Sequence, residues 1–270
     1  MKVLHVWNTA GVGSLMAKSL RKNGIDCDLF MRKSHDKFGF SKYYGDNLVN
    51  MSGGSFVNMI YNISIDYDII HVHSAFAITK ELRRLNPTKK IILQYHGSEL
   101  RNGDLNELRI YNKCVDEIIT STKDLNEYLN QNNIENTLIE NAVDTDLFYF
   151  RDDIKKDNAL MFNMKSVDQE TSLKIARSFV DWKILLINRQ KNFIHYEDMP
   201  EALNRFRYYI DIKVGLLMNG QPSQAISKTG REALACGLEV LNYKGEIVQG
   251  LPIEYTPEYQ VNKLIDLYIR

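Results

Sequence analysis

Residues 227–237 read Ser-Lys-Thr-Gly-Arg-Glu-Ala-Leu-Ala-Cys-Gly, and the apolar residues 238–241 follow them directly. Ser227 is a favourable first cap for a helix, Gly237 is a favourable last cap, and the apolar run after it predicts a buried strand. The start of a helix carries unpaired backbone N–H groups that attract anions. A carboxylate in the same turns, here Glu232, can orient sugar hydroxyls while those N–H groups hold phosphate oxygens. The segment therefore indicates chemistry on a nucleotide sugar.

Apolar stretches and helical stretches alternate outward from this segment along the whole chain. Strands are expected at 3–7, 27–30, 69–72, 91–95, 117–120, 138–139, 160–162, 184–187, 212–217 and 239–241. Helices are expected at 14–23, 75–85, 123–130, 170–179, 201–207 and 257–269. Strands separated by helices predict an α/β fold with parallel, doubly wound sheets.

The pattern restarts after the polar stretch 151–158, which we interpret as the domain boundary. The sequence thus predicts an N-terminal Rossmann-like domain over residues 1–150 and a compact C-terminal one over residues 151–270. In open α/β sheets, ligands bind beyond the carboxyl ends of the strands. Two such sheets in tandem are expected to face each other across one cleft.

Charge and hydropathy restrict the class of protein. The chain has 34 basic and 34 acidic residues, so nothing requires a nucleic acid partner. No apolar run approaches the roughly 20 residues of a membrane span, and the N-terminus lacks the pattern of a signal peptide. These features predict a cytoplasmic protein. Peripheral membrane contact stays open beside a simple solvated helix end, through the basic residues Arg83, Arg84, Lys89 and Lys90.

A glycine loop joins the first expected strand to the first helix. It consists of Gly11, Val12, Gly13 and Ser14, and it leaves a helix start free to hold a phosphate. The alternative is a glycine turn that serves only close packing. A dinucleotide fingerprint needs a third glycine, but Met16 stands in its place.

Three histidines lie near the ends of neighbouring strands. His71 and His73 alternate along one strand, and His96 ends the next strand before a glycine. No carboxylate or cysteine stands beside them at ligand spacing, so no metal site is expected. We interpret His71 as structural and His73 as a residue that hydrogen-bonds the backbone or a sugar hydroxyl. His96 is the expected functional residue, because reactive groups emerge at strand ends.

The segment 141–148, Asn-Ala-Val-Asp-Thr-Asp-Leu-Phe, completes a set of four features whose order resembles that of retaining GT-B glycosyltransferases of family 4. The resemblance implies two Rossmann-like domains and a nucleoside diphosphate sugar as donor substrate, with no metal or other cofactor. It also implies that Glu232 binds the donor ribose and that His96 contacts the transferred sugar.

Two positions depart from the family pattern. The family has a second acid eight residues before Glu232, where this chain has Gln224, which can bond sugar hydroxyls without supplying charge. The family's diphosphate-binding cations are represented only by Lys165. Lys228 and Arg231, beside Thr229 and Gly230 at the start of the 227–237 helix, can supply the missing positive charge, and the alternative is that they are two solvated cations on a loop.

The leading hypothesis is therefore a retaining glycosyltransferase whose acceptor is a glycan, a lipid-linked glycan or a small molecule. A second hypothesis is a catalytically silent relative that binds a glycan or assists another transferase. A third is a nicotinamide-dependent enzyme in which Asp26 or Asp28 binds the ribose, and Met16 counts against it.

Overall fold

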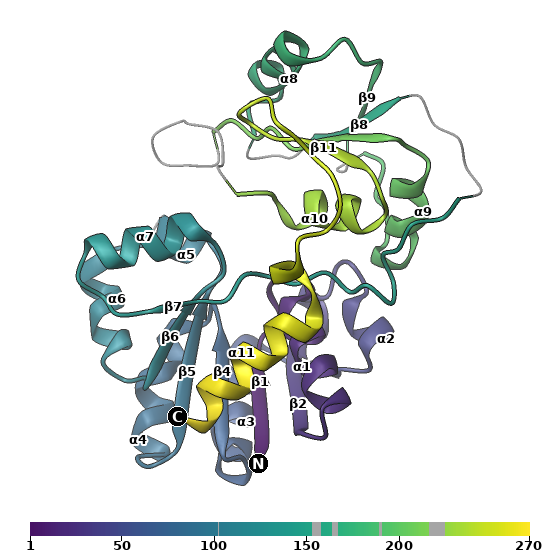
Figure 1. The fold of residues 1–270 in the computed structure, drawn as a ribbon. Coiled ribbons are helices and arrows are strands. Elements are labelled where there is room, and N and C mark those ends of the chain that lie inside the picture. Colours follow the sequence, from purple (N-terminus) through teal and green to yellow (C-terminus); the bar gives the residue numbers. More distant parts are fainter. Residues whose placement is uncertain (102, 153–157, 164–166, 189–190, 216–224) are drawn as a thin grey trace. The chain divides into compact units, whose positions relative to one another are not determined.

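The computed structural model describes the chain except for residues 102, 153–157, 164–166, 189–190 and 216–224 (Figure 1). Its contacts divide the chain into two compact units. Unit 1 comprises residues 1–142 together with 257–270, and unit 2 comprises residues 143–256. Each unit contains one sheet with helices packed against it, so the expected α/β class is confirmed.

Unit 1 is built on a parallel sheet in the order β3-β2-β1-β4-β5-β6-β7. The strands are β1 Lys2–Val6, β2 Asp26–Arg32, β3 Asn47–Val49, β4 Ile69–His73, β5 Lys90–Tyr95, β6 Glu117–Thr120 and β7 Thr137–Leu138. Every residue of β4 is buried, as are nearly all those of β1 and β5. Central strands buried on both faces are typical of a sheet covered by helices on each side.

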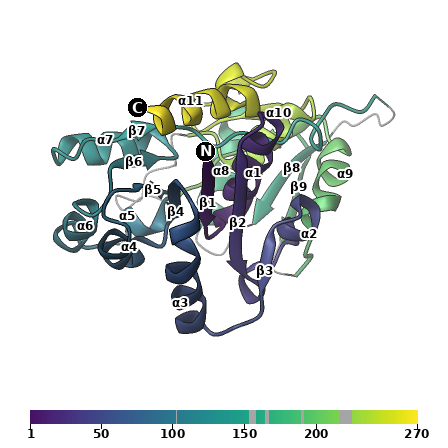
Figure 2. The ribbon, with the colours of Figure 1, turned by 90° about the horizontal axis from the view of Figure 1, so that it is seen from below.

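Helices cover both faces of this sheet (Figure 2). They are α1 Val12–Lys22, α2 Phe40–Tyr44, α3 Gly53–Ile63, α4 Thr79–Leu85, α5 Ser98–Arg101, α6 Leu105–Asn112, α7 Lys123–Gln131 and α11 Pro257–Ile269. Short 3-10 turns lie at Thr9–Gly11, Lys33–His35, Ser64–Asp66 and Phe76–Ile78. The apolar sides of α3, α4, α6 and α7 share one core cluster, and α1 and α11 share another.

The last helix belongs to unit 1, which differs from the expected division between residues 150 and 151. Val261, Leu264 and Leu267 of α11 pack in one cluster with Met16 and Leu20 of α1. Both helices thereby cover the same face of the sheet. Packing of complementary apolar faces, rather than order along the chain, decides which unit a helix joins.

Unit 2 is built on a sheet in the order β12-β11-β10-β8-β9, in which only β12 runs antiparallel to its neighbour among the described strands. Its strands are β8 Ala159–Asn163, β9 Ile184–Asn188, β10 Tyr208–Ile210, β11 Glu239–Leu241 and β12 Ile247–Val248. Its helices are α8 Gln169–Phe179, α9 Met199–Asn204 and α10 Lys228–Ala235, with 3-10 turns at Tyr196–Asp198 and Ile253–Tyr255.

The sequence analysis placed one strand of unit 2 at the wrong residues. The sequence predicted a strand over 212–217, whereas β10 spans Tyr208–Ile210 and residues 216 and 217 lie outside the described part of the chain. The strand ends where Asp211 turns its carboxylate onto the backbone of Ser227. The Asp211 N–H still donates to the Leu241 carbonyl at 2.9 Å, so backbone pairing extends one residue past β10.

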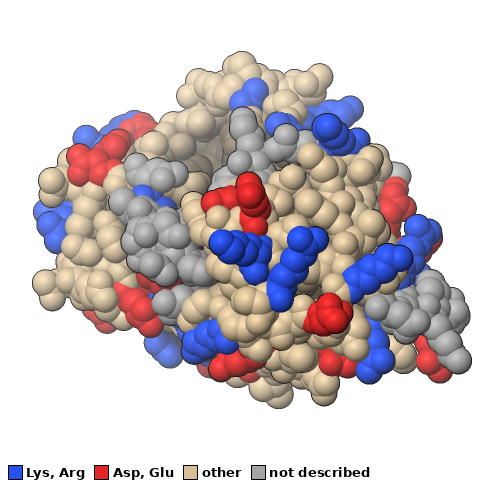
Figure 3. Space-filling model, turned by 90° about the horizontal axis from the view of Figure 1, so that it is seen from above, with Lys and Arg blue, Asp and Glu red and all other residues tan. Residues whose placement is uncertain are grey.

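In the described part of the chain, no helix is both long enough and apolar enough to cross a membrane. On the face drawn in Figure 3, lysine and arginine side chains lie among acidic ones. The four basic residues considered for membrane contact all bond within unit 1. Their partners are Asp116 for Arg83, Glu81 for Arg84, the Ser64 carbonyl for Lys89 and the Leu267 carbonyl for Lys90.

Candidate functional site

The segment 227–237 folds as the sequence predicted. Ser227 caps α10 by accepting a hydrogen bond from the backbone N–H of Gly230 at 3.2 Å. Glu232 is buried one turn further on, and its Oε1 lies 3.1 Å from the ammonium of Lys228. That ammonium also lies 4.6 Å from the centre of the Tyr196 ring. The first turns of α10 thus hold a nearly buried carboxylate beside a lysine.

Asp211 completes this end of α10, and the sequence analysis missed it. Its carboxylate accepts hydrogen bonds from the Ser227 amide and hydroxyl, each at 2.6 Å, and lies 3.0 Å from the ammonium of Lys213. A Cβ on Gly230 would lie 2.6 Å from the Asp211 carboxylate, so only glycine permits this approach. The available signal was an acid directly after an apolar strand, the position where parallel sheets place functional groups.

The other residues expected to bind the donor differ in their burial, and two of them are not described. Arg231 is 1% exposed, and its guanidinium lies 3.9 Å over the centre of the Tyr255 ring. It therefore packs inside unit 2, and Thr229 is half-buried in the first turn of α10. Lys165 and Gln224 lie outside the described residues.

The glycine loop of unit 1 is a packed turn. Gly11, Val12, Gly13 and Ser14 are all buried. A Cβ on Gly11 would lie 2.5 Å from the Phe40 ring, and Gly11 also has a φ of +79°. The close-packing alternative is thus the interpretation that the geometry of this loop favours.

The donors of Ser14 already have protein partners. Its amide donates to Asn8 Oδ1 at 3.2 Å, and its hydroxyl donates to Asp46. Burial raises the pKa of Asp46 to about 6, although the Ser14 hydrogen bond and the charge of Arg21 act in the opposite direction. Both donors of Ser14 that were expected to be free for a phosphate are therefore bonded within unit 1.

His96 uses both ring nitrogens within unit 1. Its Nε2 is hydrogen-bonded to His73 Nδ1 at 3.1 Å, and its Nδ1 to Ser121 Oγ at 3.0 Å. Its backbone N–H and that of Gly97 donate to the carboxylate of Glu99. The expected sugar-contacting residue is therefore one member of a larger polar network at the end of β5.

The network continues into the sheet through three fully buried histidines. His5 on β1 and His71 on β4 are register partners, and His73 follows two positions later on the same face. His73 bonds His5 at 2.8 Å, which differs from the expected backbone or sugar partner. Burial lowers the pKa of His5 to about 3 and that of His96 to about 4, and it also lowers the pKa values of His71 and His73.

Ligand atoms of His5, His71 and His73 all lie within 4.8 Å of one another, so metal binding must be considered. The rings of His71 and His73 stack with centres 4.4 Å apart and planes 13° apart. His5 and His73 lie edge to edge, with ring centres 5.1 Å apart, planes 25° apart and facing nitrogens 2.8 Å apart. A metal lies in the plane of each imidazole that binds it, about 2.1 Å from the nitrogen. Two nitrogens on one tetrahedral metal lie roughly 3.4 Å apart, so the 2.8 Å between His5 Nδ1 and His73 Nε2 fits a direct hydrogen bond better than a shared metal.

The residues of the nicotinamide hypothesis lie at the wrong end of their strand. Asp26 and Asp28 occupy the first half of β2, away from the carboxyl edge at which parallel sheets bind ligands. Asp28 accepts a hydrogen bond from the Tyr67 hydroxyl at 2.7 Å. The structure gives this hypothesis no support.

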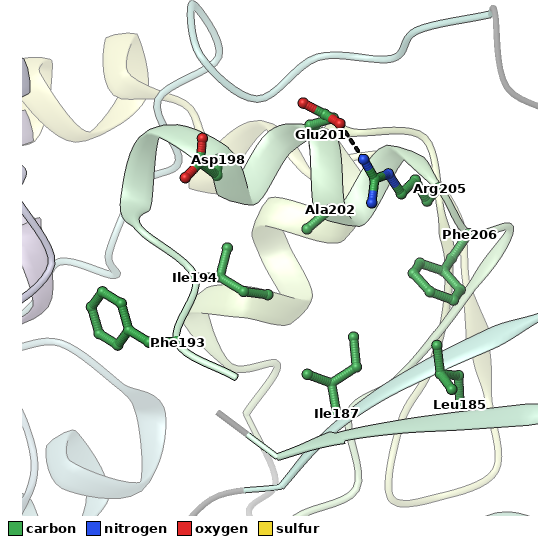
Figure 4. A pocket seen from close by; sticks show the side chains of 9 residues that line it. All are labelled: Leu185, Ile187, Phe193, Ile194, Asp198, Glu201, Ala202, Arg205 and Phe206. Carbon is green, nitrogen blue, oxygen red and sulfur yellow. Dashed lines mark hydrogen bonds and ion pairs between the residues drawn. The ribbon is translucent and has the colours of Figure 1, made fainter. Parts of the chain in front are cut away.

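Unit 2 also has an apolar hollow of about 530 Å³ between β9 and α9 (Figure 4). Leu185 and Ile187 point into it from the strand, and an ion pair between Glu201 and Arg205 lies at its rim. None of the predicted site residues in the described chain lines this hollow.

Comparisons with known proteins agree with this architecture. Residues 14–147 match Glycosyltransferase Family 4. The structure of a mutant of Staphylococcus aureus TarM matches with a TM-score of 0.57 and 9% identity, over 100% of this chain and 94% of that one. Arabidopsis thaliana UGT89C1 matches with a TM-score of 0.49 and 10% identity, over 89% of this chain and 78% of that one.

Acinetobacter baumannii MurG matches with a TM-score of 0.44 and 10% identity, over 98% of this chain and 90% of that one. No curated protein sequence matches the chain. The two sheet-and-helix units and the TarM match identify the chain as a GT-B fold protein, and its residues 14–147 match glycosyltransferase family 4.

Proposed function

We propose that the protein is a retaining glycosyltransferase that moves a sugar from a nucleoside diphosphate donor to a glycan, lipid-linked or small-molecule acceptor. The proposal includes no metal and no other cofactor. The observation that carries it is the nearly buried carboxylate of Glu232 beside Lys228 in the first turns of α10.

This pair suits the two ends of a nucleoside diphosphate. A carboxylate accepts hydrogen bonds from two ribose hydroxyls, and a lysine ammonium bonds phosphate oxygens. The side chain of Lys228 is 19% exposed and that of Glu232 is 4% exposed, so the lysine is the one that can turn outward. Donor binding would exchange the internal ion pair for one contact to phosphate and another to ribose.

The ligands of one structural relative support the kind of donor and acceptor. The matching TarM structure is a complex with UDP, which supports a nucleoside diphosphate donor. The same structure contains alpha-GlcNAc-glycerol, which supports a hydroxyl-bearing acceptor. Transfer of these ligand classes to this chain is part of the proposal.

Catalysis in this proposal is mainly electrostatic, because stabilisation of the departing diphosphate lowers the barrier without a covalent nucleophile. Lys228 provides that stabilisation together with Lys165, while Gln224 bonds the sugar hydroxyls. Ser14 contributes no hydrogen bond to the diphosphate in this proposal, since its amide and hydroxyl are bonded to Asn8 and Asp46.

Calorimetry against UDP, GDP and ADP tests the proposal, with Glu232→Gln as the variant. Loss of charge-assisted hydrogen bonds of about 1.5 to 3 kcal/mol corresponds to roughly ten- to hundredfold weaker binding. The matched control is Glu201→Gln, because Glu201 forms an ion pair of the same i,i+4 spacing with Arg205 and both of these side chains are more than half exposed. Equal affinity of the Glu232→Gln variant and the unchanged protein would contradict the assignment.

Retention is tested separately. Once a donor binds, the anomeric configuration of the product is read by NMR, and an inverted product refutes this part of the proposal. Nucleotide binding with no transfer to any acceptor would favour the catalytically silent relative instead.

A further inference from the structure

A continuous chain of hydrogen bonds joins the last helix to the end of β5. The Tyr268 hydroxyl bonds His71 Nδ1 at 2.7 Å and His5 Nε2 at 3.2 Å. His5 Nδ1 bonds His73 Nε2 at 2.8 Å, and His73 Nδ1 bonds His96 Nε2 at 3.1 Å. The chain reaches its other end where His96 Nδ1 bonds the Ser121 hydroxyl and Gln94 Nε2 donates to that hydroxyl, each at 3.0 Å.

Neutral histidine has one N–H donor and one acceptor nitrogen, so a chain of neutral imidazoles must run in a single direction. Burial lowers the pKa values of all four imidazoles, which keeps them neutral. Each internal bond of the chain uses an Nδ1 from one ring and an Nε2 from the next. Every ring in the chain therefore carries its proton on the same type of nitrogen.

Ser121 determines which direction that is. Its buried hydroxyl already accepts a hydrogen bond from the Gln94 amide. Within the described part of the chain, His96 Nδ1 is the remaining hydrogen-bond partner recorded for that hydroxyl, so its proton points to this nitrogen. His96, His73 and His5 then each donate from Nε2, and Tyr268 donates to His71.

The far end of the chain depends on the same Gln94 amide, whose Nε2 bonds Ser121 and whose Oε1 is left for His71. His71 would carry its proton on Nε2, and this buried atom has no hydrogen bond of normal geometry. The same holds for Gln94 Oε1, an acceptor. A contact with the Gln94 side chain also acts on His71 against the effect of burial. The Nε2–H of His71 and the Oε1 of Gln94 are therefore a matching donor and acceptor.

We propose that Tyr268 is a positioning residue that, together with Ser121, holds His5, His73 and His96 as Nε2–H tautomers and so fixes the imidazole of His96 at the end of β5. Reversal would place a proton on His96 Nδ1, and the Ser121 hydroxyl proton would then have no acceptor among the described residues. An unmet buried polar group costs free energy, so the reversed direction is disfavoured.

The consequence for catalysis rests on the proposed transferase function. Hydrogen bonds at both ring nitrogens fix the position of His96 at the end of β5. There the backbone amides of His96 and Gly97 donate to the carboxylate of Glu99. Tyr268 contacts neither group, so it acts only through the histidines.

The test is ¹⁵N-histidine NMR of the full chain, in which long-range couplings identify the protonated nitrogen of each ring. The unchanged protein should show Nε2–H at His5, His73 and His96. Tyr268→Phe removes the acceptor at one end and should give mixed tautomers at His73, which does not touch residue 268. The matched control is Tyr259→Phe on the same helix, where the tyrosine is 37% exposed, and it should leave the spectrum unchanged.

A second variant keeps the proposal testable if Tyr268→Phe does not fold. Ser121→Ala acts at the opposite end and should also produce mixed tautomers at His73. Nδ1–H at His73 and His96 in the unchanged protein would overturn the proposal, since the chain would then run the other way. A His73 tautomer that is unaffected in both variants would overturn it as well. None of these outcomes depends on transferase activity.

Discussion

The hydroxyl of Tyr268 lies 2.7 Å from Nδ1 of His71, although 197 positions separate the two residues along the chain. This bond joins the last helix, α11, to the buried strand β4. It explains in part why the C-terminal residues belong to unit 1, because a buried hydroxyl in this layer needs the polar partners that β1 and β4 supply.

Replacing Tyr268 with Phe should destabilise the protein by about 1–3 kcal/mol, because His5 and His71 each lose a buried hydrogen-bond partner. The measurement is urea-induced unfolding of unit 1, followed by amide exchange or fluorescence. Tyr259→Phe should change the free energy of unfolding by no more than about 0.5 kcal/mol. Equal effects of the two changes would show that the hydroxyl contributes no specific stability.

Acid should destabilise unit 1 before most carboxylates are protonated. The four buried histidines have pKa values lowered by burial, to about 3 for His5 and about 4 for His96. The unfolded chain therefore binds more protons than the folded one below the ordinary histidine pKa of about 6.5. The stability present above pH 6.5 is lost as pH falls toward about 4.

Urea titrations at several pH values measure this loss. Each group contributes up to about 1.4 kcal/mol per pH unit, so the combined slope should be steep. The control His195→Gln, at an exposed histidine, should keep the slope. A free energy of unfolding that stays constant between pH 6.5 and 4.5 would contradict the neutral state of the buried histidines.

Asp46→Asn should stabilise the protein more at pH 7.5 than at pH 4.5. Burial raises the pKa of Asp46 to about 6, so the folded state holds the proton that the unfolded state releases at lower pH. The stability from protonated Asp46 is complete below pH 4 and is lost as pH rises through 6. An amide carries no such penalty and still accepts the Ser14 hydroxyl.

Melting temperatures of both proteins across this range provide the measurement for Asp46. Asp66→Asn, at an exposed acid, is the control and should give a difference that does not vary with pH in this way. An Asp46→Asn difference that shrinks as pH rises would refute the prediction.

Alanine substitutions at two glycines distinguish the cost of a left-handed backbone from the cost of a steric clash with a neighbouring side chain. Gly11 and Gly24 have φ of +79° and +76°, but a Cβ would meet the Phe40 ring at 2.5 Å in the first and nothing within 4 Å in the second. Gly24→Ala should cost about 1–2 kcal/mol for the left-handed conformation alone. Gly11→Ala should cost about 1–3 kcal/mol more because of overpacking. Denaturant unfolding compares the two, and equal losses would mean that the loop adjusts without cost.

Much of the fold was predictable because its signals are local. The expected helices at 123–130 and 170–179 correspond to α7 Lys123–Gln131 and α8 Gln169–Phe179. Residues 38–63 contain α2, β3 and α3, none of which is among the expected elements. Short elements with aromatic residues at several spacings carry no clear period, so only packing against the sheet selects their conformation.

The candidate site was predictable in part. The residues 227–237 did indicate a capped helix with Glu232 inside, because caps and helical period depend on neighbouring residues. The partnership of Asp211 with Ser227 joins positions 16 residues apart and needs the crossing from β10 to α10. The glycine loop gave the same local signal for phosphate binding as for close packing, and the Phe40 ring that decides between them comes from another helix.

The amino-acid order by itself determined the alternation of strands and helices, the caps of α10 and the class of fold, since each depends on groups a few residues apart. Only the tertiary structure decided that α11 joins unit 1, that Asp46 lies at Ser14, and that four histidines form one chain with Tyr268. These three features depend on which side chains from distant parts of the sequence come into contact in the folded sheet. Strand register and helix packing decide these contacts, and no local sequence pattern encodes either of them.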